Sequence, residues 1–308
     1  MTRVVVVTGA SGGIGRASAV AFGRRGDKVA LLARGESGLE GAVREVEEAG
    51  GTALPIEVDV ADSDQVDAAA ERIEAELGPI DVWVNVAFST VFAPFTQIAP
   101  SEFKRTTEVT YLGYVYGTRA ALVRMKPRDH GTIVQVGSAL AYRGIPLQSA
   151  YCAAKHALKG FNDSLQSELA HDRSRVRVTM MQLSAFNTPQ FDWARSRMPR
   201  KARPMGAVFQ PELAARAILW AARHGGREVT VGYPALQAIW GSKLLPRLVD
   251  WYLARYGYDG QQTAEPKDPQ SPDNLRASLP GPFGAHGRFD RVAKKRSVQF
   301  LLRSLFRD

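Results

Sequence analysis

The sequence has 308 residues, enough for one α/β domain of about 250 residues followed by an extension. Forty Lys and Arg residues against thirty-one Asp and Glu residues give a net charge of +9, which favours attraction to phosphates without naming a partner. The single cysteine, Cys152, excludes an intrachain disulfide, and no apolar run reaches the roughly 18 residues that a membrane-spanning helix needs. We therefore expect a soluble, cytoplasmic protein.

Seven short runs rich in β-branched residues alternate with longer segments that are apolar on one helical face. For example, Ala150, Leu158 and Leu165 share a face after a candidate N-cap at Ser149. This alternation predicts βαβ units, and hence a Rossmann-like, doubly wound parallel sheet of the α/β class. The expected strands are Val4–Val7, Val29–Leu32, Ala53–Val58, Val82–Val84, Thr132–Val136, Arg177–Met181 and Glu228–Val231.

The first expected strand runs into a glycine-rich turn, and a helical pattern follows it. Glycines suit this place because the turn is tight and the backbone must approach a pyrophosphate closely. The helix N-terminus then presents unpaired amides and a partial positive charge to the phosphates. An ordinary tight turn is the alternative interpretation, but the position between strand and helix favours a dinucleotide site. The predicted cofactor-binding residues of this turn are Gly9, Ser11, Gly13, Ile14 and Gly15.

The second expected strand ends at Ala33-Arg34. An acidic side chain at this point binds the adenosine ribose 2′-hydroxyl of NAD(H), whereas an arginine accommodates the 2′-phosphate of NADP(H). Arg34 offers a guanidinium that can bind a phosphate with two hydrogen bonds. The sequence therefore predicts that NADP(H) is favoured over NAD(H). A surface arginine at the start of a loop is the alternative.

Three polar residues further along the chain suggest proton transfer. Tyr151 and Lys155 are four residues apart on one expected helix, so they share a face. A phenol with a pKa of about 10 exchanges protons poorly at neutral pH, and a nearby ammonium group lowers that pKa. Ser138 follows the strand Thr132–Val136, at the sheet edge where open α/β sheets bind ligands, and its hydroxyl can orient a substrate oxygen. A solvated helix face is the alternative explanation of the Tyr–Lys pair.

In order along the chain stand Gly9, Gly13 and Gly15, the pair Asp59-Val60, Asn85, Ser138 and Tyr151-x-x-x-Lys155. This combination resembles the short-chain dehydrogenase/reductase family over about residues 3–232. The resemblance implies an oxidoreductase in which Tyr151 exchanges the proton, Ser138 orients the substrate oxygen and Lys155 also holds the nicotinamide ribose. It implies that Asp59 accepts a hydrogen bond from the adenine amino group, and that helices around 101–125 and 150–171 pair in a homo-oligomer. The cofactor contacts that it adds are Asp59, Val60, Asn85, Ala87, Phe186 and Thr188.

The chain departs from the family pattern at Val86, Phe88, Thr110 and Leu183. Phe88 brings a large ring towards the cofactor pocket. Thr110 stands where many members have an asparagine that supports a proton-relay water, and a threonine lacks the reach of the amide. These departures leave a second hypothesis open, in which the protein binds NADP(H) as a sensor or scaffold without turnover.

The C-terminal part has a different character. Leu236–Tyr258 predicts one or two helices interrupted at Pro246, and residues 260–287 are too rich in proline and glycine for regular structure. Residues 289–306 predict an amphipathic basic helix, which docks either on the protein's own oligomer or on an anionic membrane surface. We divide the chain into a catalytic domain, 1–258, and an extension, 259–308.

The substrate is predicted only as a class. Large apolar residues around the expected cleft suggest a hydrophobic carbonyl or secondary alcohol, although core or subunit contacts explain them equally well. Five basic residues between Arg195 and Arg203 either attract an anionic substrate or form a solvated surface. We predict no metal site and no nucleic-acid binding. The apolar residues are Phe88, Phe92, Phe95, Leu140, Tyr142, Leu147, Phe191, Trp193 and Met198.

Overall fold

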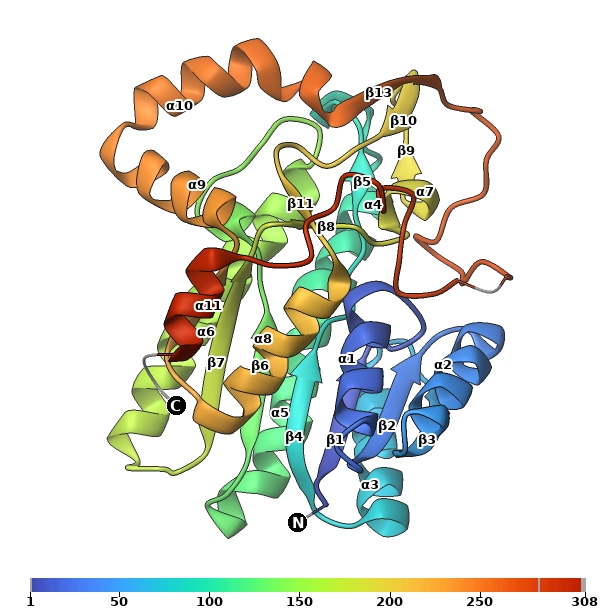
Figure 1. Ribbon diagram of the computed structural model, residues 1–308, viewed down its shortest axis with the longest axis vertical. Coiled ribbons are helices and arrows are strands. Elements are labelled where there is room, and N and C mark those ends of the chain that lie inside the picture. Colours follow the sequence, from blue (N-terminus) through green and yellow to red (C-terminus); the bar gives the residue numbers. More distant parts are fainter. Residues whose placement is uncertain (1, 282, 306–308) are drawn as a thin grey trace.

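The computed structural model describes residues 2–281 and 283–305, and its centre is a seven-stranded parallel sheet (Figure 1). The strand order β12-β7-β6-β4-β1-β2-β3 places the start of the chain mid-sheet and reverses the winding between β1 and β4. This is the Rossmann-like, doubly wound order, so the predicted fold class is confirmed. The strands are β1 (Val4–Thr8), β2 (Lys28–Ala33), β3 (Thr52–Glu57), β4 (Ile80–Asn85), β6 (Thr132–Val136), β7 (Arg177–Leu183) and β12 (Glu228–Val231).

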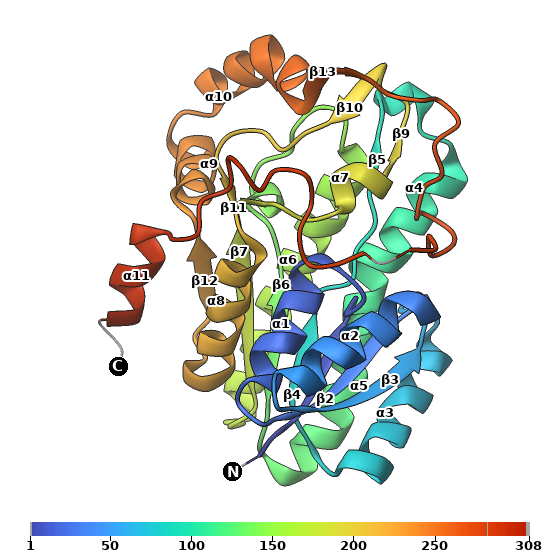
Figure 2. The same ribbon diagram turned by 45° about the vertical axis from the view of Figure 1, so that its right-hand side comes forward.

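Helices cover both faces of the sheet because successive side chains of each strand point to opposite sides. On β1, Val5 and Val7 pack into the core with α1, α2 and α8, whereas Val4 and Val6 pack into the core with α3, α5 and α6 (Figure 1, Figure 2). Burial on both faces explains the continuous valine run of β1. The helices are α1 (Gly13–Gly23), α2 (Glu36–Glu48), α3 (Ser63–Leu77), α5 (Gly113–Met125), α6 (Ser149–His171) and α8 (Pro211–His224).

Helix α6 begins at Ser149, so the predicted N-cap is wrong by one residue. Gln148 is the N-cap, and its carbonyl accepts a hydrogen bond from the Cys152 amide at 2.9 Å. The side chain of Gln148 donates to Gln261 Oε1 of the extension at 2.7 Å. We attribute the shift to this tertiary contact, which fixes the residue before the helix independently of its capping preference.

A layer of short elements lies over the carboxyl ends of the strands (Figure 1). It contains three two-stranded pairings, β5 with β9, β8 with β11, and β10 with β13. Since open α/β sheets bind ligands outside the carboxyl ends of their strands, this layer covers the expected site. Its elements are β5 (Val91–Phe92), α4 (Pro100–Thr107), β8 (Ala185–Phe186), α7 (Gln190–Trp193), β9 (Arg195–Ser196), β10 (Arg200–Ala202), β11 (Val208–Phe209) and β13 (Gln262–Pro266).

Two helices end the catalytic domain, and the extension after them returns to the sheet. Helices α9 (Tyr233–Leu244) and α10 (Pro246–Tyr252) meet at Pro246, where the sequence predicts the interruption. Strand β13 lies inside the segment predicted to lack regular structure; it forms because β10 offers an antiparallel partner. After β13 the chain crosses the end of α1 (Figure 1, Figure 2), where Gly284 O accepts a hydrogen bond from the Gly13 amide at 3.1 Å.

The predicted basic helix at 289–306 is wrong in its first half, because helix α11 spans only Val298–Leu305. The residues before it bond to the layer instead, with the Lys294 amide donating to Val208 O at 2.8 Å. Helix α11 docks on the same chain: Phe300 is buried against Trp220, and Gln299 Nε2 donates to Thr230 O of β12 at 2.9 Å. Phe306, also part of the prediction, lies outside the described residues.

Candidate active site

The predicted site residues converge on one cavity of about 600 Å³, between the carboxyl ends of the strands and the layer above them. Fourteen of the fifteen residues predicted for cofactor or catalysis line this cavity; the exception is Asn85. Asn85 is buried behind it, where its side chain bonds Trp83 Nε1 at 2.9 Å and Gln135 Oε1 at 3.0 Å. The Asn85 side chain therefore holds β4 to its neighbours.

The glycine-rich turn forms one end of the cavity. Gly13 has a φ of +56°, and a Cβ added there would lie 3.2 Å from the Thr188 side chain. A Cβ on Gly15 would lie 2.1 Å from the carbonyl oxygen of Gly9, because α1 starts directly against β1. The backbone thus leaves an open cradle at the N-terminus of α1. Side chains in place of Gly13 and Gly15 would fill that cradle. This geometry fits the pyrophosphate of a dinucleotide.

The next part of the cavity lies at the ends of β2 and β3. Arg34 Nη2 donates to Asn274 O of the extension at 2.6 Å. Asp59, expected to meet an adenine amino group, has its Oδ2 in an ion pair with Arg105 Nη2 at 2.5 Å. Sequence reasoning missed Arg105 because it lies on α4, far along the chain from Asp59, and no motif marks it. Val60 lines the cavity beside this pair.

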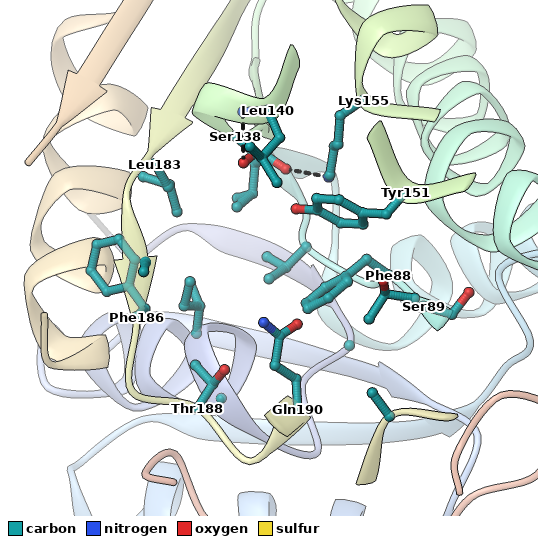
Figure 3. A pocket seen from close by; sticks show the side chains of 18 of the residues that line it. Phe88, Ser89, Ser138, Leu140, Tyr151, Lys155, Leu183, Phe186, Thr188 and Gln190 are labelled. Atoms are coloured by element: carbon teal, nitrogen blue, oxygen red, sulfur yellow. Dashed lines mark hydrogen bonds between the residues drawn. The ribbon is translucent and has the colours of Figure 1, made fainter. Parts of the chain in front are cut away.

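The three predicted catalytic residues come from two neighbouring elements. Ser138 follows β6, and its Oγ accepts a hydrogen bond from the Leu140 amide at 3.1 Å. Tyr151 and Lys155 lie one turn apart on α6, with Lys155 Nζ 5.7 Å from the centroid of the Tyr151 ring. Figure 3 shows the polar ends of all three side chains turned towards the same part of the cavity. The arrangement can place a hydroxyl and a phenol at one substrate oxygen, with an amine behind the phenol.

Burial controls the protonation of this group. It lowers the pKa of Lys155 to about 7 and raises the pKa of Tyr151 well above its usual value, while a hydrogen bond with Ser138 acts in the opposite direction on Tyr151. The net pKa of Tyr151 is therefore raised by burial, and the lowering that the sequence predicts from Lys155 stays a prediction. The Lys155 ammonium donates elsewhere, to Val136 O at 2.8 Å and to Tyr114 Oη at 3.0 Å.

Tyr114 is a second site residue that sequence reasoning missed. Its hydroxyl donates to Val136 O at 3.0 Å and accepts from Lys155, so the three groups form a closed, buried triangle. Thr110 stands at the position of the asparagine that supports a proton-relay water in many family members. Its Oγ1 bonds the backbone of Ser89 at 2.9 and 3.0 Å. The signal was present in the sequence, because Tyr114 lies one helical turn after Thr110 and shares its face.

With this geometry in view, comparison with known proteins decides the family. The family model described as short chain dehydrogenase matches residues 3–198. The chain is a short-chain dehydrogenase. It is 33% identical over 275 residues to the uncharacterized oxidoreductase YxnA of Bacillus subtilis, covering 89% of this chain and 77% of that protein.

Two further relatives of this short-chain dehydrogenase carry more specific names. The 3-dehydrosphinganine reductase of Danio rerio is 34% identical over 223 residues, which cover 70% of this chain and 67% of that protein. An alcohol dehydrogenase structure from the archaeon Thermococcus sibiricus, complexed with 5-hydroxy-NADP, superposes with a TM-score of 0.65 at 26% identity. That match covers 75% of this chain and 95% of the archaeal one.

Most of the apolar residues predicted around the cleft of this dehydrogenase fall into two groups, whereas Phe95 is exposed and Tyr142 packs beside Tyr114. Phe92, Leu147 and Met198 are buried in one packed cluster and belong to the core. Phe88, Leu140 and Trp193 line the cavity, as do residues of α9 and α10 that the sequence did not indicate. The ring of Phe88 packs edge-on to Tyr151, with centroids 5.6 Å apart. The part of the lining that these residues supply is therefore mainly apolar.

The basic segment 195–203 of the dehydrogenase is largely paired within the chain. Arg195 and Arg197 both donate to the buried carboxylate of Glu102, and Arg195 also pairs with Asp273 at 2.8 Å. Burial alone would raise the pKa of Glu102, but hydrogen bonds from Arg197, Arg195 and the Ala99 amide lower it to about 2. Both arginines bind Glu102 of α4, and Arg195 also binds the extension, which removes them as candidates for attracting a substrate.

Proposed function

We propose that this short-chain dehydrogenase reduces the carbonyl group of a hydrophobic substrate with NADPH, Tyr151 supplying the proton. The main support is the convergence of the glycine cradle, Arg34 and the Ser138–Tyr151–Lys155 group on one cavity. The nicotinamide, when bound, supplies the hydride to the carbonyl carbon. Tyr151 gives the phenolic proton to the oxygen, so a carbonyl becomes an alcohol.

Each protein group has a distinct part in this proposal. Ser138 donates a hydrogen bond to the substrate oxygen and orients it towards Tyr151. The raised pKa of Tyr151 keeps the phenol protonated at neutral pH, which suits a proton donor and therefore the reductive direction. Lys155, once protonated, stabilises the phenolate that remains after transfer. Its pKa of about 7 means that both forms are populated near neutral pH.

The proposed preference for NADP(H) rests on Arg34. The side chain lines the cavity at the end of β2, a place where a carboxylate would repel a 2′-phosphate. The archaeal neighbour with its bound NADP analogue agrees with this preference. We expect NADPH to bind at least several-fold more tightly than NADH. Arg34→Ala should remove that difference, and equal affinities in the wild type would contradict the proposal.

The proposed substrate is a long-chain or similarly bulky ketone. The substrate end of the cavity is lined by apolar side chains, including Leu140, Phe191 and Leu253. The 3-dehydrosphinganine reductase among the relatives carries the name of a lipid ketone reductase, which agrees with this class. Short polar ketones would leave most of this surface uncovered and should be poor substrates.

We further propose a homo-oligomer formed through α5 and α6. A groove between these helices is lined mostly by apolar side chains, among them Leu122, Val123 and Phe161, and Val123 is 58% exposed. Such a face is typical of subunit contacts. Contact of the tail with an anionic membrane also stays a prediction; none of the helices in the described part of the chain is long and apolar enough to cross one.

The decisive experiment compares wild type with Tyr151→Phe. Turnover of a ketone with NADPH should fall by roughly 10²- to 10⁴-fold, as for loss of a general acid, while NADPH affinity changes little. Tyr116→Phe removes a hydroxyl outside the cavity lining and is the matched control. Retention of most activity in Tyr151→Phe would refute the mechanism. Binding of NADPH without reduction of any ketone, aldehyde or quinone would favour the sensor hypothesis.

A further inference from the structure

The C-terminal extension reaches the end of β2, where it contacts two arginines from distant parts of the chain. Arg34 donates to Asn274 O at 2.6 Å and to Leu275 O at 3.4 Å. Arg105 Nε donates to the same Leu275 carbonyl at 3.2 Å. One backbone oxygen of the extension therefore lies between two guanidinium groups, which brings two positive charges close together.

The extension is anchored at this place by Leu275. Its side chain is fully buried in an apolar cluster with Val91, Ala93 and Ile98. The Leu275 amide donates to Asp273 Oδ1 at 3.1 Å. Since the buried side chain and the bonded amide fix the backbone at Leu275, the carbonyls of residues 274 and 275 are held in place to orient Arg34.

Arg34 keeps most of its hydrogen-bonding capacity. A guanidinium has five N–H donors, and the two bonds above use two of them. Ser278 of the extension adds a hydroxyl beside it: a Cβ built on Gly35 would lie 2.9 Å from Ser278 Oγ, and all three residues line the cavity. Gly35 is the N-cap of α2, a helix of 13 residues, so the first amides of that helix begin at the same point.

The net charge of the cavity wall around Arg34 depends on Arg105. Asp59 lines the cavity here, and a free carboxylate would repel a phosphate. Arg105 pairs with it at 2.5 Å, with only 13% of the arginine side chain exposed. The pair neutralises Asp59 and leaves Arg34 as the uncompensated charge. Burial, then the charge of Arg105, lowers the pKa of Arg34, and Asp59 acts in the opposite direction.

We propose that the extension completes a phosphate-monoester site for the 2′-phosphate of NADP(H), in which Arg34 and Ser278 bind the phosphate and Arg105 acts as a positioning residue that neutralises Asp59. This inference rests on the proposed preference for NADP(H). It adds that the preference depends on the extension and on α4, outside the first βαβ unit. Without Arg105, the carboxylate of Asp59 would stand uncompensated near the phosphate. Without the extension, no backbone carbonyl would orient the guanidinium of Arg34.

The test uses the full chain and two probes that differ only in the phosphate, adenosine 2′,5′-bisphosphate and 5′-AMP, with both affinities measured by calorimetry. Arg105→Gln should lower the affinity ratio between them by about 10-fold, since Asp59 becomes a free charge. Asp59→Asn combined with Arg105→Gln should restore most of that ratio. Arg175→Gln, which breaks an exposed pair with Asp129, is the matched control and should leave the ratio unchanged.

Two further variants test the extension. Ser278→Ala should lower the ratio by roughly 3- to 10-fold by removing one hydrogen bond to a charged group, and Leu275→Ser should lower it more by releasing the anchor. An unchanged ratio in both Arg105→Gln and Ser278→Ala, with a wild type that favours the bisphosphate, would overturn this inference alone. Failure of the double variant to recover would overturn the electrostatic role of Arg105. A wild-type protein that binds the bisphosphate no more tightly than 5′-AMP would overturn both this inference and the proposed cofactor preference.

Discussion

The first βαβ unit and the C-terminal extension line the same cavity, yet different kinds of contact hold them in place. In the βαβ unit, Gly15 packs directly on Gly9, and a continuous parallel ladder joins β1 to β2. Between β13 and α11, the extension forms no helix or strand in its described residues, and separate anchors such as Leu275 and Phe300 fix it. Damage to the βαβ unit should therefore abolish the site, whereas damage to an anchor should remove one wall of it.

The largest effect is expected in the βαβ unit. Gly15→Val places a side chain 2.1 Å from the Gly9 carbonyl, so α1 must move away from β1. We expect a loss of about 4 kcal/mol or more in the free energy of unfolding and no measurable NADPH binding. Thermal unfolding and fluorescence titration measure both. Gly160→Ala in α6, where no atom lies within 4 Å of the added Cβ, is the control and should be neutral or slightly stabilising.

A smaller effect is expected at Glu102, whose partner Arg195 also pairs with Asp273 of the extension. Glu102→Gln weakens the bonds of Glu102 to Arg195 and Arg197, and should cost about 2–3 kcal/mol at pH 7. The pKa of Glu102 is lowered to about 2, so this stabilisation is complete above the pKa of the unfolded chain and disappears as the pH falls towards 2. Urea denaturation between pH 7 and pH 3 should show the two proteins converging. A difference independent of pH would contradict this assignment.

The tail provides a matched pair of substitutions on one helix. Phe300 is 6% exposed and packs on Trp220, whereas Leu302 on α11 is 52% exposed. Phe300→Ala should cost about 2 kcal/mol, and Leu302→Ala should stay within about 0.5 kcal/mol of wild type. If Phe300→Ala releases α11 from the sheet, hydrogen exchange of the β12 amides should become faster. Equal effects of the two substitutions would show that α11 does not dock as described.

The smallest effect is expected at Tyr114, a residue of the catalytic domain that only tertiary contact brings to Lys155. Tyr114→Phe removes the hydroxyl that accepts from Lys155 Nζ. We expect kcat to fall by about 10-fold with KM nearly unchanged, since the amine keeps only its bond to Val136 O. The pH profile of kcat should shift as well. A change in thermal stability with an unchanged kcat and pH profile would indicate a purely structural role.

How far the sequence predicted the site depends on the distance between the interacting residues along the chain. The glycine turn and the Tyr151–Lys155 pair follow from spacings of a few residues, and both line the cavity. The family resemblance also named Asn85, whose side chain bonds Trp83 and Gln135 instead. An isolated polar residue at a strand end carries no sign of whether it faces a cavity or a neighbouring strand, because neighbouring strands come from distant parts of the sequence.

The sequence by itself determined the α/β class, the parallel sheet and the family, and it named the residues proposed to surround the reacting oxygen, because strand and helix periodicity and local motifs depend on near neighbours. Only the tertiary structure decided the pairing of Arg105 with Asp59, the contact between Tyr114 and Lys155, and the course of the extension over the cavity. These contacts join residues at least 41 positions apart, and Arg34 and Leu275 are 241 positions apart. Such contacts form only after the sheet has brought its strand ends together, so no local pattern records them.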